Sequence, residues 1–181
     1  MTAAFTPVAE PPPDEAPTLQ RLVDCNARLL RHGANLRQLP LYLRECGADA
    51  PARDAAIELL HFFDAVLPRQ HAALEHALIP ALIEAMAGSD AVCLHQLGDG
   101  LALAHTNLQR RWRELRPALL ELAADRPASL SAQQVESLID CCQASVQRAN
   151  DELLPMAARL LSDIQLQTLS RALQPGQSAA T

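Results

Sequence analysis

The chain has 181 residues, 15 basic and 21 acidic side chains, a net charge of −6 and 49% hydrophobic residues. This length and composition predict one globular domain with a hydrophobic core and exclude a disordered chain. The acidic balance argues against nucleic-acid binding, which requires a basic surface, and gives no reason to expect attraction to anionic lipid. Aromatic residues make up only 3%, which favours helices over a β-sheet fold.

The sequence also indicates a compartment. No apolar run approaches the roughly 18 residues of a membrane span, and no basic segment followed by an apolar block marks a secretory signal. The five cysteines have no paired spacing, which fits a reducing environment. We therefore expect a cytoplasmic protein without a membrane segment.

The chain divides into three parts. Residues 1–17 are rich in Pro and Ala and predict a flexible tail, and a second short tail is expected over residues 175–181. The domain between them, residues 18–174, has a helical pattern almost throughout. Helices are expected over about residues 19–44, 52–86, 90–124, 132–161 and 163–173. Long helices joined by short loops predict an all-α, antiparallel up-down four-helix bundle with a short C-terminal fifth helix.

Capping residues and prolines mark the ends and interruptions of these helices. The expected caps are Thr18 for the first helix, Ser89 or Asp90 for the third, and the capping boxes Ser131–Gln134 and Ser162–Gln165 for the last two. Kinks or short breaks are expected at the prolines inside the helices, which are Pro40, Pro68, Pro80, Pro117 and Pro155.

Each long helix carries one polar residue in the middle of its apolar stripe, if successive residues turn by about 100°. These residues are Asn26, Gln70, His105 and Ser145. A buried polar group without a partner costs about 1–3 kcal/mol, so the four residues are expected to meet in a core polar layer. Within that layer we expect His105 to be hydrogen-bonded to Gln70.

Several segments resemble one known family. Residues 62–82, FFDAVLPRQHAALEHALIPAL, are similar to the second helix of hemerythrin-like (HHE cation-binding) proteins. Asp24-Cys25-Asn26 resembles the family's D-C-H on the first helix. Residues 105–117 and 152–157 resemble its third and fourth helices, through the H…W…LRP pattern and the ELLPMA segment. The resemblance covers about residues 19–173.

The resemblance implies a non-haem di-iron centre inside the bundle, held by His and Glu side chains spaced four residues apart. In this sequence the six implied ligand positions are Asn26, Gln70, Leu74, His105, Ser145 and Ala149. Only His105 retains a metal-binding side chain. The resemblance therefore also predicts that the di-iron centre is lost, with Leu74 and Ala149 filling the volume of the former carboxylates.

One further pair could bind a metal. His71 and Glu75 have the His-x-x-x-Glu spacing, but they are one residue out of register with the family's pair. A regular helix turns them about 100° away from the core, onto an exposed flank. There they form either an ordinary solvated contact or, together with His105, a weak metal-binding candidate.

These observations favour a bundle without a cofactor or catalytic residues, which acts as an interaction or regulatory protein through a protein partner or a small ligand. A homodimer is compatible with this function. The alternative is a hemerythrin-like protein that still binds non-haem iron and works in O₂, NO or iron sensing or storage. A hydrolase or redox enzyme has no supporting constellation of residues.

Overall fold

The computed structural model describes residues 17–86 and 91–174, and within these ranges the chain is helical and contains no strand. The predicted all-α class is therefore confirmed. The predicted tails lie outside the described residues, except for Pro17. The expected caps Ser89 and Asp90 also lie outside them.

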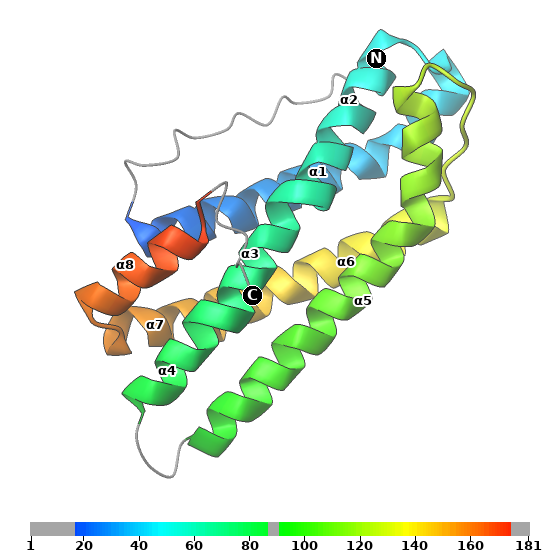
Figure 1. Ribbon diagram of the computed structural model, residues 1–181. Helices are drawn as coiled ribbons and strands as arrows, with labels where there is room; N and C mark the ends of the chain where they lie inside the picture. The colour runs from blue at the N-terminus through cyan, green and yellow to red at the C-terminus, as the bar shows by residue number, and fades with distance from the viewer. Residues whose placement is uncertain (1–16, 87–90, 175–181) are drawn as a thin grey trace.

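Four long helical segments and one short helix make up the described residues (Figure 1). The first segment is α1 (Thr18–Cys46), and the third is α5 (Ala91–Ala123). The second consists of α2 (Ala50–His61), the π-helical turn η1 (Phe62–Val66), α3 (Leu67–Ala73), the π-helical turn η2 (Leu74–Leu78) and α4 (Ile79–Ala85). The fourth consists of α6 (Ala132–Arg148), η3 (Ala149–Leu153) and α7 (Leu154–Leu160), and the short helix is α8 (Asp163–Ala172).

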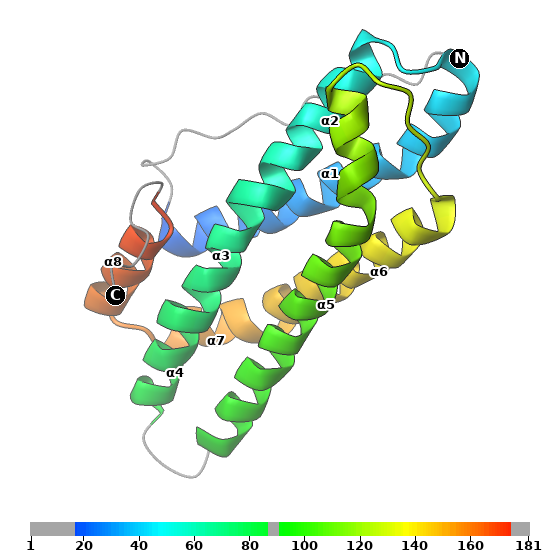
Figure 2. The ribbon, with the colours of Figure 1, turned by 45° about the vertical axis from the view of Figure 1, so that its right-hand side comes forward.

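The long segments pack in pairs. Figures 1 and 2 show α1 beside α6, and α5 beside the segment from α2 to α4. Contacts of α5 with α6 and of α1 with α2 join the two pairs. The short α8 lies against the start of α1, where Arg21 donates a hydrogen bond to the Ser170 hydroxyl at 3.1 Å.

The helix starts agree in part with the predicted caps. Ser162 and Gln165 form the full capping box of α8, as predicted. Ser131 accepts a bond from the backbone of Gln134, which is one half of the predicted box. Thr18 does not cap α1: it lies inside the helix, and its hydroxyl donates to a backbone carbonyl of α8.

Prolines interrupt the helices in a regular way. Pro68, Pro80 and Pro155 each stand at the second position of an α-helix that directly follows a π-helical turn. A proline has no N–H and its ring crowds the carbonyl one turn earlier, and a π-helical turn opens the backbone at that point. Pro40 and Pro117 lie inside α1 and α5, which continue through them.

The hydrophobic core consists of two clusters, one toward each end of the long segments. On every long segment the residues of one cluster are followed by those of the other. The boundary falls between Leu22 and Leu29, between Leu67 and Ala73, between Leu101 and Leu108, and between Val146 and Leu153. No helix of the described residues is long and apolar enough to cross a membrane.

Asp64 in η1 links the second segment to α5. Its Oδ1 accepts a hydrogen bond from Trp112 Nε1 at 2.7 Å, and its Oδ2 lies 2.9 Å from Arg116 Nε. Trp112 is 5% exposed, so its N–H depends on this acceptor.

We predict that Asp64→Ala lowers the free energy of unfolding by about 1–3 kcal/mol, because the buried indole N–H loses its partner. Asp64→Asn keeps an oxygen acceptor and loses only the exposed ion pair with Arg116, a loss of less than about 1 kcal/mol. Urea unfolding followed by the fluorescence of Trp112, the chain's single tryptophan, measures both values. Equal losses in the two variants would show that the Trp112 bond contributes nothing.

Candidate functional site

Polar side chains lie where the two hydrophobic clusters meet. Asn26 on α1, Gln70 and His71 on α3, and His105 on α5 all fall at the cluster boundary of their segment. Their side chains are only 2–5% exposed. Polar side chains therefore cross the middle of the interior, between the two clusters, and Arg28, His32 and Asn35 are further buried polar residues beside one cluster.

Three amide side chains form one half of this region. Gln70 Nε2 donates to Asn26 Oδ1 at 2.9 Å, and Asn26 Nδ2 donates to Asn150 Oδ1 at 2.9 Å. Asn150 belongs to η3 on the fourth segment and is exposed. The chain of amides thus joins three long segments and leads from the interior to the surface.

Two imidazoles and a carboxylate form the other half. The rings of His71 and His105 are stacked with centroids 3.4 Å apart and an interplanar angle of 6°. His105 Nδ1 lies 2.5 Å from Glu75 Oε1. We call the six side chains of the two halves the polar layer; they are Asn26, Gln70, His71, Glu75, His105 and Asn150.

Burial keeps both imidazoles neutral. Burial, together with a smaller contribution from the charge of His105, lowers the pKa of His71 to about 3. Burial also lowers the pKa of His105, although the hydrogen bond and the charge of Glu75 oppose this shift. A neutral His105 donates its Nδ1–H to Glu75, which fixes the tautomer and leaves a lone pair on Nε2. Within the described residues, no partner reaches His105 Nε2, His71 Nδ1 or Gln70 Oε1.

The structure pairs these residues differently from the sequence expectation. The expected bond between His105 and Gln70 is replaced by the bonds of His105 to Glu75 and of Gln70 to Asn26. Ser145 is 6% exposed, but in the part of the chain that the structure describes its hydroxyl joins neither half of the polar layer. The expected burial of Leu74 and Ala149 is observed, at 3% and 4% exposure.

The predicted exposure of His71 is wrong, and the π-helical turns explain why. Each such turn contains one residue more than an α-helical turn, so every later residue moves one position around the helix. A regular helix would bury Val66 and Ala77, but the structure buries Leu67 at 2% and Leu78 at 0%. His71 enters the interior beside Gln70 for the same reason, and Glu75 comes within reach of His105.

Asn150 was not expected from the sequence. It directly follows Ala149, one of the implied ligand positions, just as Glu75 follows Leu74. Both lie in π-helical turns that precede a proline by a few residues. The prolines that follow were the available signal in the sequence. A proline inside a helical pattern indicates an irregular turn, after which the residue following the expected position can face inward.

The polar layer does not fit the di-iron centre that the resemblance implies. An imidazole binds a metal ion in its ring plane, about 2 Å from the nitrogen. The nearly parallel ring planes of His71 and His105 do not intersect near the cluster, so no single ion can lie in both. In the described residues, no group of three or more His, Cys, Asp or Glu side chains is arranged to hold a metal ion.

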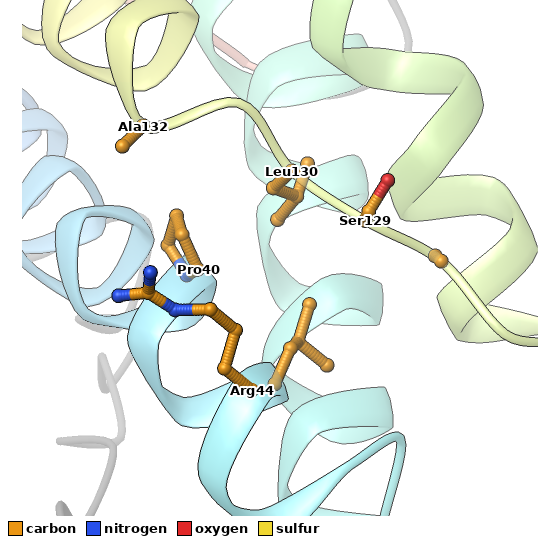
Figure 3. A pocket seen from close by; sticks show the side chains of 7 residues that line it. Pro40, Arg44, Ser129, Leu130 and Ala132 are labelled. Atoms are coloured by element: carbon orange, nitrogen blue, oxygen red, sulfur yellow. The ribbon is translucent and has the colours of Figure 1, made fainter.

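A surface pocket of about 250 Å³ lies away from the polar layer (Figure 3). Pro40, Leu43 and Arg44 of α1 line one side. The other side is lined by residues 128–130 of the loop between α5 and α6 and by Ala132 at the start of α6. None of the candidate site residues lines this pocket.

The comparisons with known proteins assign no family to the chain. No family model matches it, and no curated protein is significantly similar to it.

We predict that the amide half of the layer behaves as one unit. Asn26→Leu leaves the buried Gln70 amide without its acceptor and lowers the free energy of unfolding by about 1–3 kcal/mol. Adding Gln70→Leu restores part of this loss, because both partners are then apolar. A double-mutant cycle in urea measures the coupling, which we expect to be about 1 kcal/mol. Strictly additive losses would contradict the proposed unit.

The buried histidines predict acid sensitivity. Burial and the charges of Arg28, Arg31 and His61 lower the pKa of His32 to about 4, and burial lowers that of His71 to about 3. The unfolded chain takes up these protons near pH 6.5, whereas the folded chain does so only at much lower pH. The stabilisation is therefore present above pH 6.5 and is lost as the pH falls toward 4.

We expect each of these histidines to reduce the free energy of unfolding by roughly 1.4 kcal/mol per pH unit over that range. His71→Gln should make the decrease between pH 6.5 and pH 4 less steep, as measured by urea unfolding at several pH values. His76→Gln, a change at an exposed position, is the control and should leave the slope unchanged. A slope that His71→Gln does not alter would be inconsistent with a buried neutral imidazole.

Proposed function

We propose that this chain is an antiparallel four-helix bundle of hemerythrin-like descent that has lost its di-iron centre and acts as a non-enzymatic interaction or regulatory protein. The observation that supports this proposal is the polar layer. It lies at the level where the resemblance implies the metal ligands. Its amides bond to one another, and its two imidazoles stack, with His105 bonded to Glu75.

The charges of the layer support the same conclusion. A di-iron centre is held by several carboxylates because they offset the charge of the ions. Leu74 and Ala149 occupy two of the implied carboxylate positions, and Glu75 is the one carboxylate in the layer. Neutral imidazoles and amides match this low charge, since they need no counter-ion to remain buried.

The enclosed position of the layer supports interaction rather than catalysis. The imidazoles are 4% and 2% exposed, and the layer reaches the surface at the amide of Asn150 and at the carboxylate of Glu75, which is 27% exposed and bonded to His105. A general base or a nucleophile must reach its substrate within hydrogen-bond distance. We therefore place the function of the protein on its surface and give the interior a structural role.

A second function is favoured by one observation. His71, Glu75 and His105 bring two imidazoles and a carboxylate together, and two of their nitrogens have no partner within the described residues. If the His71 ring rotated out of the stack, these side chains could hold one iron ion, since imidazole and carboxylate together suit iron. The protein would then work in O₂, NO or iron sensing or storage.

Metal analysis separates the two proposals. We expect protein purified without chelators to contain far less than one equivalent of iron per chain by elemental analysis. We also expect His105→Ala to leave that content unchanged. One equivalent or more of iron, lost in His105→Ala but retained in His76→Ala, would favour the iron-binding alternative.

A gain-of-function variant tests the proposed descent. Changing Asn26, Gln70 and Ser145 to His, together with Leu74→Glu and Ala149→Glu, rebuilds the implied ligand set. We expect this variant to take up two equivalents of iron when it is refolded with Fe(II), whereas the unchanged chain takes up none. Folding verified by circular dichroism without iron uptake would contradict the proposed position of the former site.

A further inference from the structure

Helix α1 has a second apolar face on the outside of the protein. Val23, Leu30 and Leu41 are 37%, 41% and 51% exposed. Ala27 and Ala34 lie between them in the sequence and are also exposed. Leu30 stands four residues after the buried Asn26, where a regular helix would turn it toward the interior, and the structure instead turns it to the surface. We call these five residues the outer stripe.

The outer stripe runs along the most exposed line of α1. At about 100° per residue, its members lie within about 60° of one another, opposite the buried Leu29 and Leu36. Their spacing alternates between four and three residues, which is the pattern of a helix that pairs with another helix. Arg37 stands at the next position of this pattern, and its guanidinium turns aside to Glu136 on α6, at 2.8 and 2.7 Å.

We propose that the outer stripe pairs with the same stripe of a second copy of this chain, with the two α1 helices antiparallel. A two-fold axis near residue 28 places Leu30 of each copy against Ala27 of the other. The same axis places Val23 of each copy against Ala34 of the other. Large side chains then face small ones, so the helices can approach closely and leave no gap.

The charges beside the stripe agree with this antiparallel arrangement. Asp24 and Arg31 lie seven residues apart on one flank, so they stand two turns apart on the same side of α1. In the antiparallel pair, Asp24 of each copy comes beside Arg31 of the other, and the symmetry forms this contact twice. Within the described residues, Arg31 makes no hydrogen bond or ion pair, and Asp24 accepts only from Gln20, at 2.9 Å.

This self-complementarity is the reason for choosing a second copy as the partner. An interface with two-fold symmetry must satisfy every contact with the same patch on both sides. The outer stripe does so for Val23, Ala27, Leu30 and Ala34 and for the two charges beside them. The inference concerns the surface and stands independently of the proposal about the polar layer.

Sedimentation equilibrium of the full chain tests the pairing. We expect a reversible dimer that is populated at about 100 µM. Leu30→Glu should weaken the association by about 100-fold or more, because it places two charges in an apolar contact. Leu103→Glu on α5 is the matched control, since Leu103 is 62% exposed and lies outside the stripe. It should leave the dimer intact. As monomers, both variants should unfold at the same temperature as the unchanged chain.

Charge reversal tests the direction of the helices. Asp24→Arg and Arg31→Asp should each weaken the dimer by about tenfold, because like charges then meet across the axis. An equimolar mixture of the two variants should regain the original association, since each charge again faces its opposite. A chain that stays monomeric at about 100 µM, or a dimer that survives Leu30→Glu, overturns the proposal. Failure of the mixture to recover overturns the antiparallel arrangement.

Discussion

The need to satisfy buried polar groups governs the middle of this protein. Asn26, Gln70, His71 and His105 are removed from water between two apolar clusters, so each must find its partners inside the protein. The amide pair between α1 and α3 and the bond from His105 on α5 to Glu75 on the second segment meet part of this need across different helices. Within the described residues, three further buried atoms have no partner: Gln70 Oε1, His71 Nδ1 and His105 Nε2. Sliding a helix by one turn would separate these partners, so the layer fixes the register that the apolar clusters alone would leave loose.

Sequence reasoning succeeded wherever the helix is regular. On α5, His105 is buried as expected, and so are the residues on the same side of a regular helix, because an α-helix keeps a constant turn per residue. These residues are Leu94, Leu101, Leu108 and Trp112. The all-α class followed from the same periodicity together with the scarcity of aromatic residues. Helix ends were recovered to within a few residues, since the residues that mark them act locally.

The failures have three physical sources. A π-helical turn before each of three prolines changes the phase of the helix by one residue, and this change brought His71, Glu75 and Asn150 to positions that a regular helix would not give them. The second source is the choice of partner. His105 has several polar groups on neighbouring helices, and the sequence does not contain the distances that select Glu75 over Gln70. The outer position of Leu30 was missed because α1 is apolar on two faces, and periodicity alone does not tell which face is covered.

Helix α1 has one apolar face in the interior and a second one on the surface of the protein. The polar layer buries its neutral imidazoles, and it reaches solvent through the amide of Asn150 and the half-buried carboxylate of Glu75, which is bonded to His105. Leu30 is exposed and therefore contributes little to the stability of a single chain, because a leucine side chain stabilises a protein mainly when it is removed from water. The outer stripe of α1 lies beside the opposite charges of Asp24 and Arg31. Its apolar side chains add to stability only when another helix covers them and removes them from water. In this protein the interior therefore sets the register of the helices, and we propose that the protein acts through the outer side of α1.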